Sequence, residues 1–99
     1  MPESKITLKV NQIDIPLDRF VSIFIDNVVS GMVVILANGG EIEKINLGII
    51  TDDVSIKLND DLIQLNRFVN MIIGNTVKGM VCSLRGVDQI NSLNIEIIK

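Results

Sequence analysis

The chain has 99 residues, which is the size of one small domain. Hydrophobic residues make up 47% of it and charged residues 21%, so the composition is that of a folded protein rather than a disordered one. The net charge of −3 disfavours the basic surface that nucleic acid binding requires. Because the chain has no histidine and one cysteine, we expect no metal site, no cofactor and no catalytic residue.

The start of the chain alternates polar and apolar residues and lacks the continuous apolar run of a signal peptide. We therefore expect a cytoplasmic location. Residues 20–37 are strongly apolar, but Asp26, Asn27 and Ser30 interrupt them, which predicts a buried amphipathic helix rather than a membrane span. Neither a membrane nor a nucleic acid is an expected partner.

The sequence repeats itself with an offset of about 48 residues. About 18 of roughly 47 aligned pairs are identical, several times the number expected from composition alone. For example, Arg19-Phe20-Val21 aligns with Arg67-Phe68-Val69, and Gly31-Met32-Val33 aligns with Gly79-Met80-Val81. We therefore predict a single domain, residues 1–99, built by tandem duplication of two units at about 5–51 and 53–99.

Each unit begins with alternating residues that are typical of a half-buried strand, at 6–10 in the first unit. The turn-forming pair Asn11-Gln12 follows, and apolar residues resume after it, which predicts a hairpin. Asp18 then offers an N-cap for a helix that should run to Ala37, and alternating apolar residues near 45–49 predict a third strand. The second unit repeats these features at 54–58, Asn59-Asp60, Asn66, Arg85 and 93–97.

These elements predict an α+β protein of two layers, with six mostly antiparallel strands and two long helices packed together on one face. Each unit is a ββαβ motif, for which a split arrangement in the strand order 2-1-3, with a right-handed crossover, satisfies the handedness of such connections. The order of the strands between the units, and whether they form one sheet or two, stays open.

Each predicted helix separates into three stripes at 100° per residue. The first stripe is apolar and should cover the sheet, the second mixes phenylalanine with asparagine and glycine, and the third carries charged residues and should face water. In the first helix the stripes are Val21, Ile25, Val28, Val29, Met32 and Leu36; then Phe20, Phe24, Asn27, Gly31 and Ile35; then Arg19, Ser22, Asp26, Ser30 and Ala37. The second helix repeats them at the offset given above.

Two glycines lie in the middle of the predicted helices at matching positions, Gly31 and Gly79. Glycine costs about 1 kcal/mol relative to alanine inside a helix, and close approach of another element is the usual compensation. We predict that the two helices cross at these glycines, with Asn27 and Asn75 bonding each other or a backbone carbonyl one turn earlier. The alternative is that each glycine relieves a clash with the sheet.

Three other features have ordinary structural interpretations. Asp26 is the one carboxylate in the first helix, and we expect a solvated surface acid rather than a general base. Cys82 lies inside the second helix and should behave as a small hydrophobic residue. Asn38-Gly39-Gly40 follows a helix instead of preceding one, so it predicts a helix cap and turn rather than a phosphate-binding loop.

The leading functional hypothesis is a non-enzymatic binding or assembly module that acts through protein contacts, including self-association. It depends on the missing catalytic groups and on an apolar content that so small a domain cannot easily bury. Val33 and Val81, which are apolar residues on the otherwise polar stripe, are candidate contact residues. The alternative is an anionic small-molecule or enzymatic site in the groove between the helices or at their N-termini. The candidate ligand or interface residues are Arg19, Asn27, Gly31, Arg67, Asn75 and Gly79.

Overall fold

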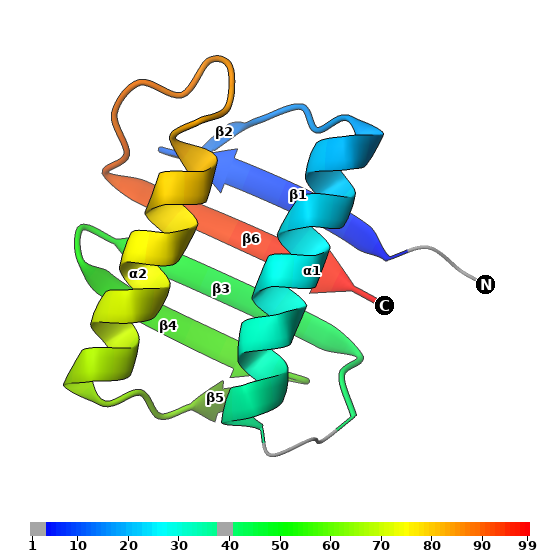
Figure 1. The fold of residues 1–99 in the computed structure, drawn as a ribbon, viewed down its shortest axis with the longest axis vertical. Helices are drawn as coiled ribbons and strands as arrows, with labels where there is room; N and C mark the ends of the chain where they lie inside the picture. The colour runs from blue at the N-terminus through cyan, green and yellow to red at the C-terminus, as the bar shows by residue number, and fades with distance from the viewer. Residues whose placement is uncertain (1–3, 38–40) are drawn as a thin grey trace.

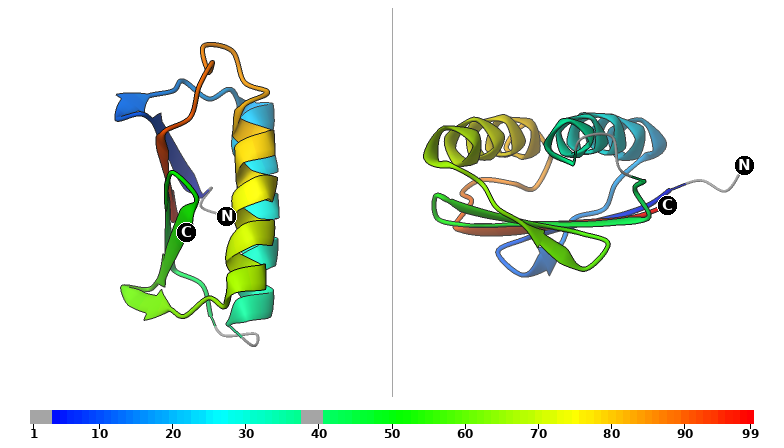
Figure 2. Two further views of the ribbon diagram at one scale, coloured as in Figure 1. Left: turned by 90° about the vertical axis from the view of Figure 1, so that its left-hand side faces the viewer. Right: turned by 90° about the horizontal axis from the view of Figure 1, so that it is seen from below.

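The computed structural model describes residues 4–37 and 41–99. Within them, six strands form one sheet and two helices cover one of its faces (Figures 1 and 2). The predicted α+β two-layer class is therefore confirmed. In chain order the elements are β1 (Lys5–Val10), β2 (Ile13–Asp14), α1 (Arg19–Leu36), β3 (Lys44–Ile50), β4 (Asp53–Leu58), β5 (Asp61–Ile63), α2 (Arg67–Val81) and β6 (Ser92–Ile98).

The strands of the two halves interleave in one continuous sheet with the order β2-β1-β6-β3-β4-β5, and every neighbouring pair is antiparallel. Within each unit the strands have the predicted split arrangement in the order 2-1-3, because β6 lies between β1 and β3, and β3 lies between β4 and β6. In each half, the strands before and after the helix are separated by one strand position. The central strand of the other half occupies that position and satisfies the backbone hydrogen-bonding groups there. Both halves have the element order ββαβ, while their origin by duplication stays a prediction.

The hairpin turns are tight because their central residues accept positive φ angles. Asn11 and Gln12 have φ of 50° and 68°, and Asn59 and Asp60 have 50° and 70°. Two successive positive φ angles are typical of the type I′ turn, whose twist matches that of antiparallel strands. The predicted hairpins β1–β2 and β4–β5 are confirmed.

The turn asparagines have a second role that sequence reasoning did not identify. Asn59 Oδ1 accepts hydrogen bonds from the backbone amides of Glu43 and Lys44, both at 2.9 Å. Asn11 makes the matching pair of contacts with the backbone that enters β6. Each asparagine therefore fastens the central strand of the other half to the hairpin of its own half.

Both helices begin at the predicted N-caps. The side chains of Asp18 and Asn66 accept hydrogen bonds from the amides of Val21 and Val69, each at 2.8 Å. These contacts satisfy backbone donors that have no partner within the first turn of a helix.

The two helices end differently. α1 ends at Leu36, next to the predicted Ala37, but α2 ends at Val81, well before the predicted Arg85. The early end lets Val87, which is 8% exposed, pack into the core. Gly86 then adopts the left-handed conformation predicted there, with a φ of 82°. The predicted turn Asn38-Gly39-Gly40 lies outside the described residues.

The core fills the space between the helix layer and the sheet. Val33 and Val81 are 0% exposed, so the prediction that they mark a contact surface is wrong. Each helix is rotated about its own axis relative to the prediction. The middle of its sheet-facing side therefore lies nearer to these valines than the sequence pattern indicated. The buried core residues are Ile25, Val29, Val33, Ile73, Val77 and Val81 of the helices, Leu8, Val10, Ile45, Leu47, Ile49, Val54, Ile56, Leu93, Ile95 and Ile97 of the strands, and Val87.

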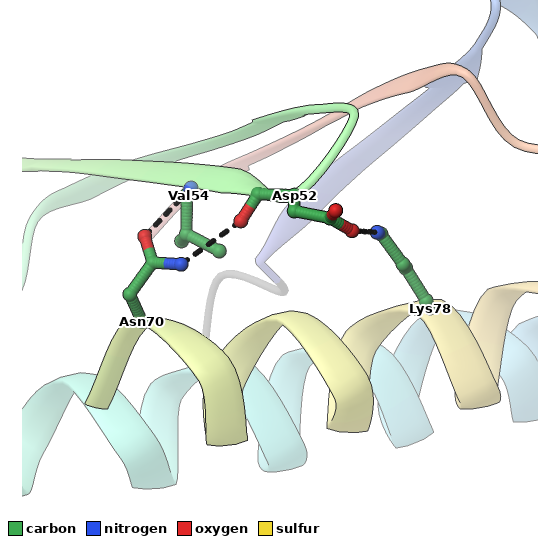
Figure 3. Close-up of polar contacts among 4 residues, drawn as sticks. All are labelled: Asp52, Val54, Asn70 and Lys78. Carbon is green, nitrogen blue, oxygen red and sulfur yellow. Dashed lines mark hydrogen bonds and ion pairs between the residues drawn. The ribbon is translucent and has the colours of Figure 1, made fainter. Parts of the chain in front are cut away.

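The polar stripe of α2, predicted to face water, instead contacts the edge of the sheet (Figure 3). Asn70 Oδ1 accepts a hydrogen bond from the Val54 amide, and its Nδ2 donates to the carbonyl oxygen of Asp52, both at 2.9 Å. Lys78 Nζ lies 2.9 Å from Asp52 Oδ1. A Cβ atom on Gly74 would lie 3.3 Å from Val54 Cγ2, so the close approach of a glycine to the sheet occurs here.

The polar stripe of α1 is held in a similar way by Asp26. Its carboxylate lies 2.6 Å from Lys99 Nζ and accepts a hydrogen bond of 2.8 Å from the Ser30 hydroxyl. Burial alone would raise the pKa of Asp26, but hydrogen bonds from Lys99, Ser30 and Ser4 outweigh it and hold the pKa below its ordinary value. The expectation of a solvated surface acid is therefore wrong, and the lowered pKa does not suit a general base.

Candidate functional site

The second stripe of each helix lies on the side of the helix layer that points away from the sheet, toward the viewer in Figure 1. Every one of its residues is exposed, and so are two further residues beside the stripe on each helix, which the sequence pattern does not place in it. We name this surface the outer helix face. It consists of Phe20, Ile23, Phe24, Asn27, Gly31, Val34 and Ile35 of α1, and Phe68, Met71, Ile72, Asn75, Gly79, Cys82 and Ser83 at the α2 side.

The outer helix face exposes much apolar surface. Phe20 and Ile35 are 72% and 78% exposed, and Phe68 is 64% exposed. At roughly 200 Å² for a fully exposed large side chain, the eight large apolar residues of the face present roughly 900 Å². The largest apolar patch of a typical monomer is about 300–600 Å², and larger ones mark interaction sites.

The outer helix face also carries no charged side chain. A helix that covers a sheet normally presents its charged residues to water on the side opposite the sheet. Here Asp26 of α1 instead pairs with Lys99, directly after β6, and Lys78 of α2 pairs with Asp52, in the turn between β3 and β4. The apolar residues of each helix are therefore distributed as in a helix that is covered both by the sheet and on the opposite side.

The predicted glycine crossing of the two helices is wrong. A Cβ atom added at Gly31 or Gly79 would meet no atom of the described chain within 4 Å. Asn27 and Asn75 are exposed, and their side chains form no hydrogen bond within the part of the chain that the structure describes. The rotation of the helices that buries Val33 and Val81 turns these four residues outward, so nothing within the described residues explains why glycine occupies either position.

The helices are antiparallel neighbours with an apolar groove between them. It has a volume of about 210 Å³ and lies between the start of α1 and the end of α2. Ser83 is its one polar lining residue; the others are Phe20, Val21, Phe24, Ile25, Met80 and Leu84. This lining suits an apolar side chain and offers no counter-charge to the anionic metabolite of the alternative hypothesis.

Arg19 and Arg67 do not converge on one ligand. They begin α1 and α2, and because the helices are antiparallel they lie at opposite ends of the helix layer (Figure 1). A carboxylate beside each arginine disfavours a bound anion. The depression beside Arg19, about 510 Å³, includes Asp18 and Asp26, and the one beside Arg67, about 440 Å³, includes Asp52 and Asp53.

The open face of the sheet, on the side without helices, carries a depression of about 570 Å³. Gly48 forms part of its lining, next to Ser55 and Asn94, and Lys9 and Asp53 contribute opposite charges to it. Across residues 4–37 and 41–99, no cluster of three or more acidic or sulfur-bearing side chains is placed to hold a metal ion.

Within the described chain, α1 is the one helix that is long and apolar enough to cross a membrane by length and composition alone. A core helix of a water-soluble protein satisfies the same criteria. In the fold, α1 lies along the sheet and buries Ile25, Val29 and Val33 against it. The predicted amphipathic helix is therefore present, but only its sheet-facing side is buried.

No protein family, curated protein or solved structure matches this chain. Function is therefore inferred from the surfaces of the chain itself. Among these surfaces, the outer helix face differs most from the polar and charged surface that is expected in contact with water.

Proposed function

We propose that this protein is a non-enzymatic assembly module whose outer helix face binds an apolar protein surface. The observation that carries the proposal is the combination of roughly 900 Å² of exposed apolar surface with the absence of any charged side chain on that face. A specific interface buries about 800 Å² on each partner and is depleted of charge at its centre.

The arrangement of the polar side chains supports the same proposal. Asp26, Asn70 and Lys78 all take part in contacts that hold the helices against the sheet. The helix layer is thereby fixed in one rotation, with its apolar side outward, before any partner binds. A rigid surface loses little conformational entropy on association, which favours its use as a binding face.

The same proposal places the module in the cytoplasm, where its single thiol stays reduced. Cys82 is exposed on the outer helix face and its duplicate position is held by Val34, so both are part of the surface that a partner covers. The proposal includes the origin of the two halves of the chain by duplication, since the outer helix face presents equivalent residues from both helices.

Site-specific photo-cross-linking in the cells that naturally produce the chain tests the proposal. The photoactivatable residue benzoylphenylalanine replaces Phe24 on the outer helix face or, as a control, Leu62 on β5, which is 62% exposed. We expect a discrete protein adduct from position 24 and none from position 62. Excess unmodified chain should suppress the adduct, whereas excess Phe24→Glu chain should not. Equal adducts from both positions, or none from position 24, would reject the proposal.

A further inference from the structure

We propose that the partner covering the outer helix face is a second copy of this chain, docked helix layer against helix layer. This inference rests on the proposed function and names its partner. The product is a four-layer assembly in which two sheets enclose four helices. Each chain contributes the same surface, as in the isologous interface of a two-fold dimer.

The extent of the surface fits a second copy. The exposed apolar residues of the face amount to roughly 900 Å², close to the 800 Å² or so that each partner buries in an interface of standard size. The face extends over both helices, from Phe20 and Ile35 on α1 to Phe68 on α2. A second copy offers a surface of equal extent, with two antiparallel helices at the same spacing, so all of the face can be covered at once.

The charge distribution also fits a second copy. Each chain carries a net charge of −3, so two copies repel each other weakly wherever charged surfaces meet. The outer helix face is the part of the helix layer without charge, and pairing it with itself brings no ion out of water. A partner selected by opposite charge would have nothing to bind on this face.

The glycines and asparagines explain how two identical faces come close. Gly31 and Gly79 leave open space on the outside of the helices, where a helix of the second copy can approach. Asn27 and Asn75 lie one turn earlier, and an amide both donates and accepts hydrogen bonds, so equivalent amides of two copies can pair. An asparagine in an apolar helix interface is a known means of specifying one register.

The groove between the helices provides a socket. Its volume of about 210 Å³ and its lining by Phe20, Phe24, Met80 and Leu84 suit an apolar side chain. In a two-fold dimer, each copy inserts a side chain into the groove of the other, so both grooves are filled.

Sedimentation equilibrium over a range of concentrations, with wild type and three variants, tests the inference. We expect the wild type to pass from monomer to dimer. Phe24→Glu should raise the dimer dissociation constant at least about 100-fold, because it places an unpaired carboxylate in the interface. Gly31→Leu should raise the dissociation constant at least about tenfold by filling the open space at Gly31. The control Leu62→Glu, which adds the same charge off the face, should change it less than about twofold.

Chemical modification of the single cysteine tests independently which face is covered. Cys82 is exposed on the outer helix face. Its rate of modification by a maleimide should fall as the wild-type concentration rises through the dissociation constant. In Phe24→Glu the rate should be independent of concentration. Circular dichroism of each variant at low concentration confirms that the monomer is folded, so that loss of the dimer is not loss of the fold.

Three outcomes would overturn the inference: a wild type that stays monomeric up to millimolar concentration, a dimer that persists in Phe24→Glu, and a dimer that leaves Cys82 fully reactive. A monomeric wild type that still forms the discrete photo-adduct at position 24 with another protein rejects the second copy and keeps the proposed function. A monomer that forms no adduct, or that binds phosphatidylcholine vesicles through Phe24 instead, rejects both.

Discussion

Asn70 of α2 accepts a hydrogen bond from the backbone amide of Val54 at 2.9 Å, on the side of β4 where a further strand would otherwise pair. The same side chain donates to the carbonyl oxygen of Asp52, so one amide satisfies both a donor and an acceptor at the sheet edge (Figure 3). Unpaired groups at an edge are a liability for aggregation. The contact also sets the rotation of α2, which decides that Phe68 and Met71 point outward.

Asn70→Ala should therefore lower the free energy of unfolding by about 1–3 kcal/mol, because a partly buried amide and carbonyl lose their partner. Asn75→Ala is the matched control on the same helix, since Asn75 is exposed on the outer helix face, and we expect a change below about 0.5 kcal/mol in the monomer. Urea denaturation at low protein concentration measures both. Equal losses in the two variants would contradict the edge contact.

Neighbouring valines in α1 test the rotation of the helix. Val33 is 0% exposed and Val34 is 43% exposed. Val33→Ala should cost about 1–3 kcal/mol of unfolding free energy by opening a cavity in the core, whereas Val34→Ala should cost less than about 0.5 kcal/mol. The comparison is made by thermal or urea denaturation of the monomer. If Val33→Ala cost as little as Val34→Ala, neither valine would face the sheet, and the helix would have the rotation that its sequence pattern predicts.

The open space at the outer glycines predicts that alanine stabilises the monomer. Gly31→Ala and Gly79→Ala should each raise the free energy of unfolding by about 0.5–1 kcal/mol, since alanine favours the helix and the added methyl group meets no neighbour. Gly74→Ala is the contrasting variant, because its Cβ would press on Val54 at 3.3 Å, and its gain should be smaller. A loss of stability at Gly31 in dilute solution would show that an element of the same chain covers it.

The contact between Asp26 and Lys99 predicts a dependence of stability on pH. Because the folded-state pKa of Asp26 lies below its ordinary value, the ionised carboxylate stabilises the fold above the unfolded-state pKa, and this stabilisation is lost as the pH falls through the folded-state pKa. Asp26→Asn should cost about 0.5–1 kcal/mol at pH 7, and the difference from wild type should shrink below about pH 4.

Lys99→Met provides the control for that effect. It removes the ammonium group, which lies 2.6 Å from the carboxylate, but leaves the Ser30 hydrogen bond in place. We expect it to lose part of the stability that Asp26→Asn loses. Unfolding free energies of the three proteins from pH 2.5 to 7 measure the effect, and a difference that does not vary with pH would rule out the ion pair as its source.

Local patterns predicted much of the architecture. Asp18 and Asn66 cap the helices as expected, and Asn11-Gln12 and Asn59-Asp60 form the expected turns, because these features depend on residues that are close in sequence. The way the strands of the two halves join could not be predicted, because it depends on the pairing of β3 with β6, whose residues are distant in the chain.

The candidate site was predicted only in part. The sequence pattern indicates Asn27, Gly31, Asn75 and Gly79 as candidate interface residues, but it places them at a crossing between the two helices of one chain. The apolar arc of each helix is wide enough to cover a sheet and another surface, and periodicity does not tell which part of a wide arc faces the sheet. Ile23 and Met71 were not singled out for the same reason.

The elements, their caps and turns and the two-layer class can be read from the amino-acid sequence, because neighbouring residues and their periodicity specify these features. Only the tertiary structure decided which side of each helix is outermost. That choice depends on contacts such as Asn70 with Val54 and Asp26 with Lys99, which join polar groups far apart in the sequence and satisfy them between the helices and the sheet. With the polar sides of the helices held there, their remaining apolar sides face outward.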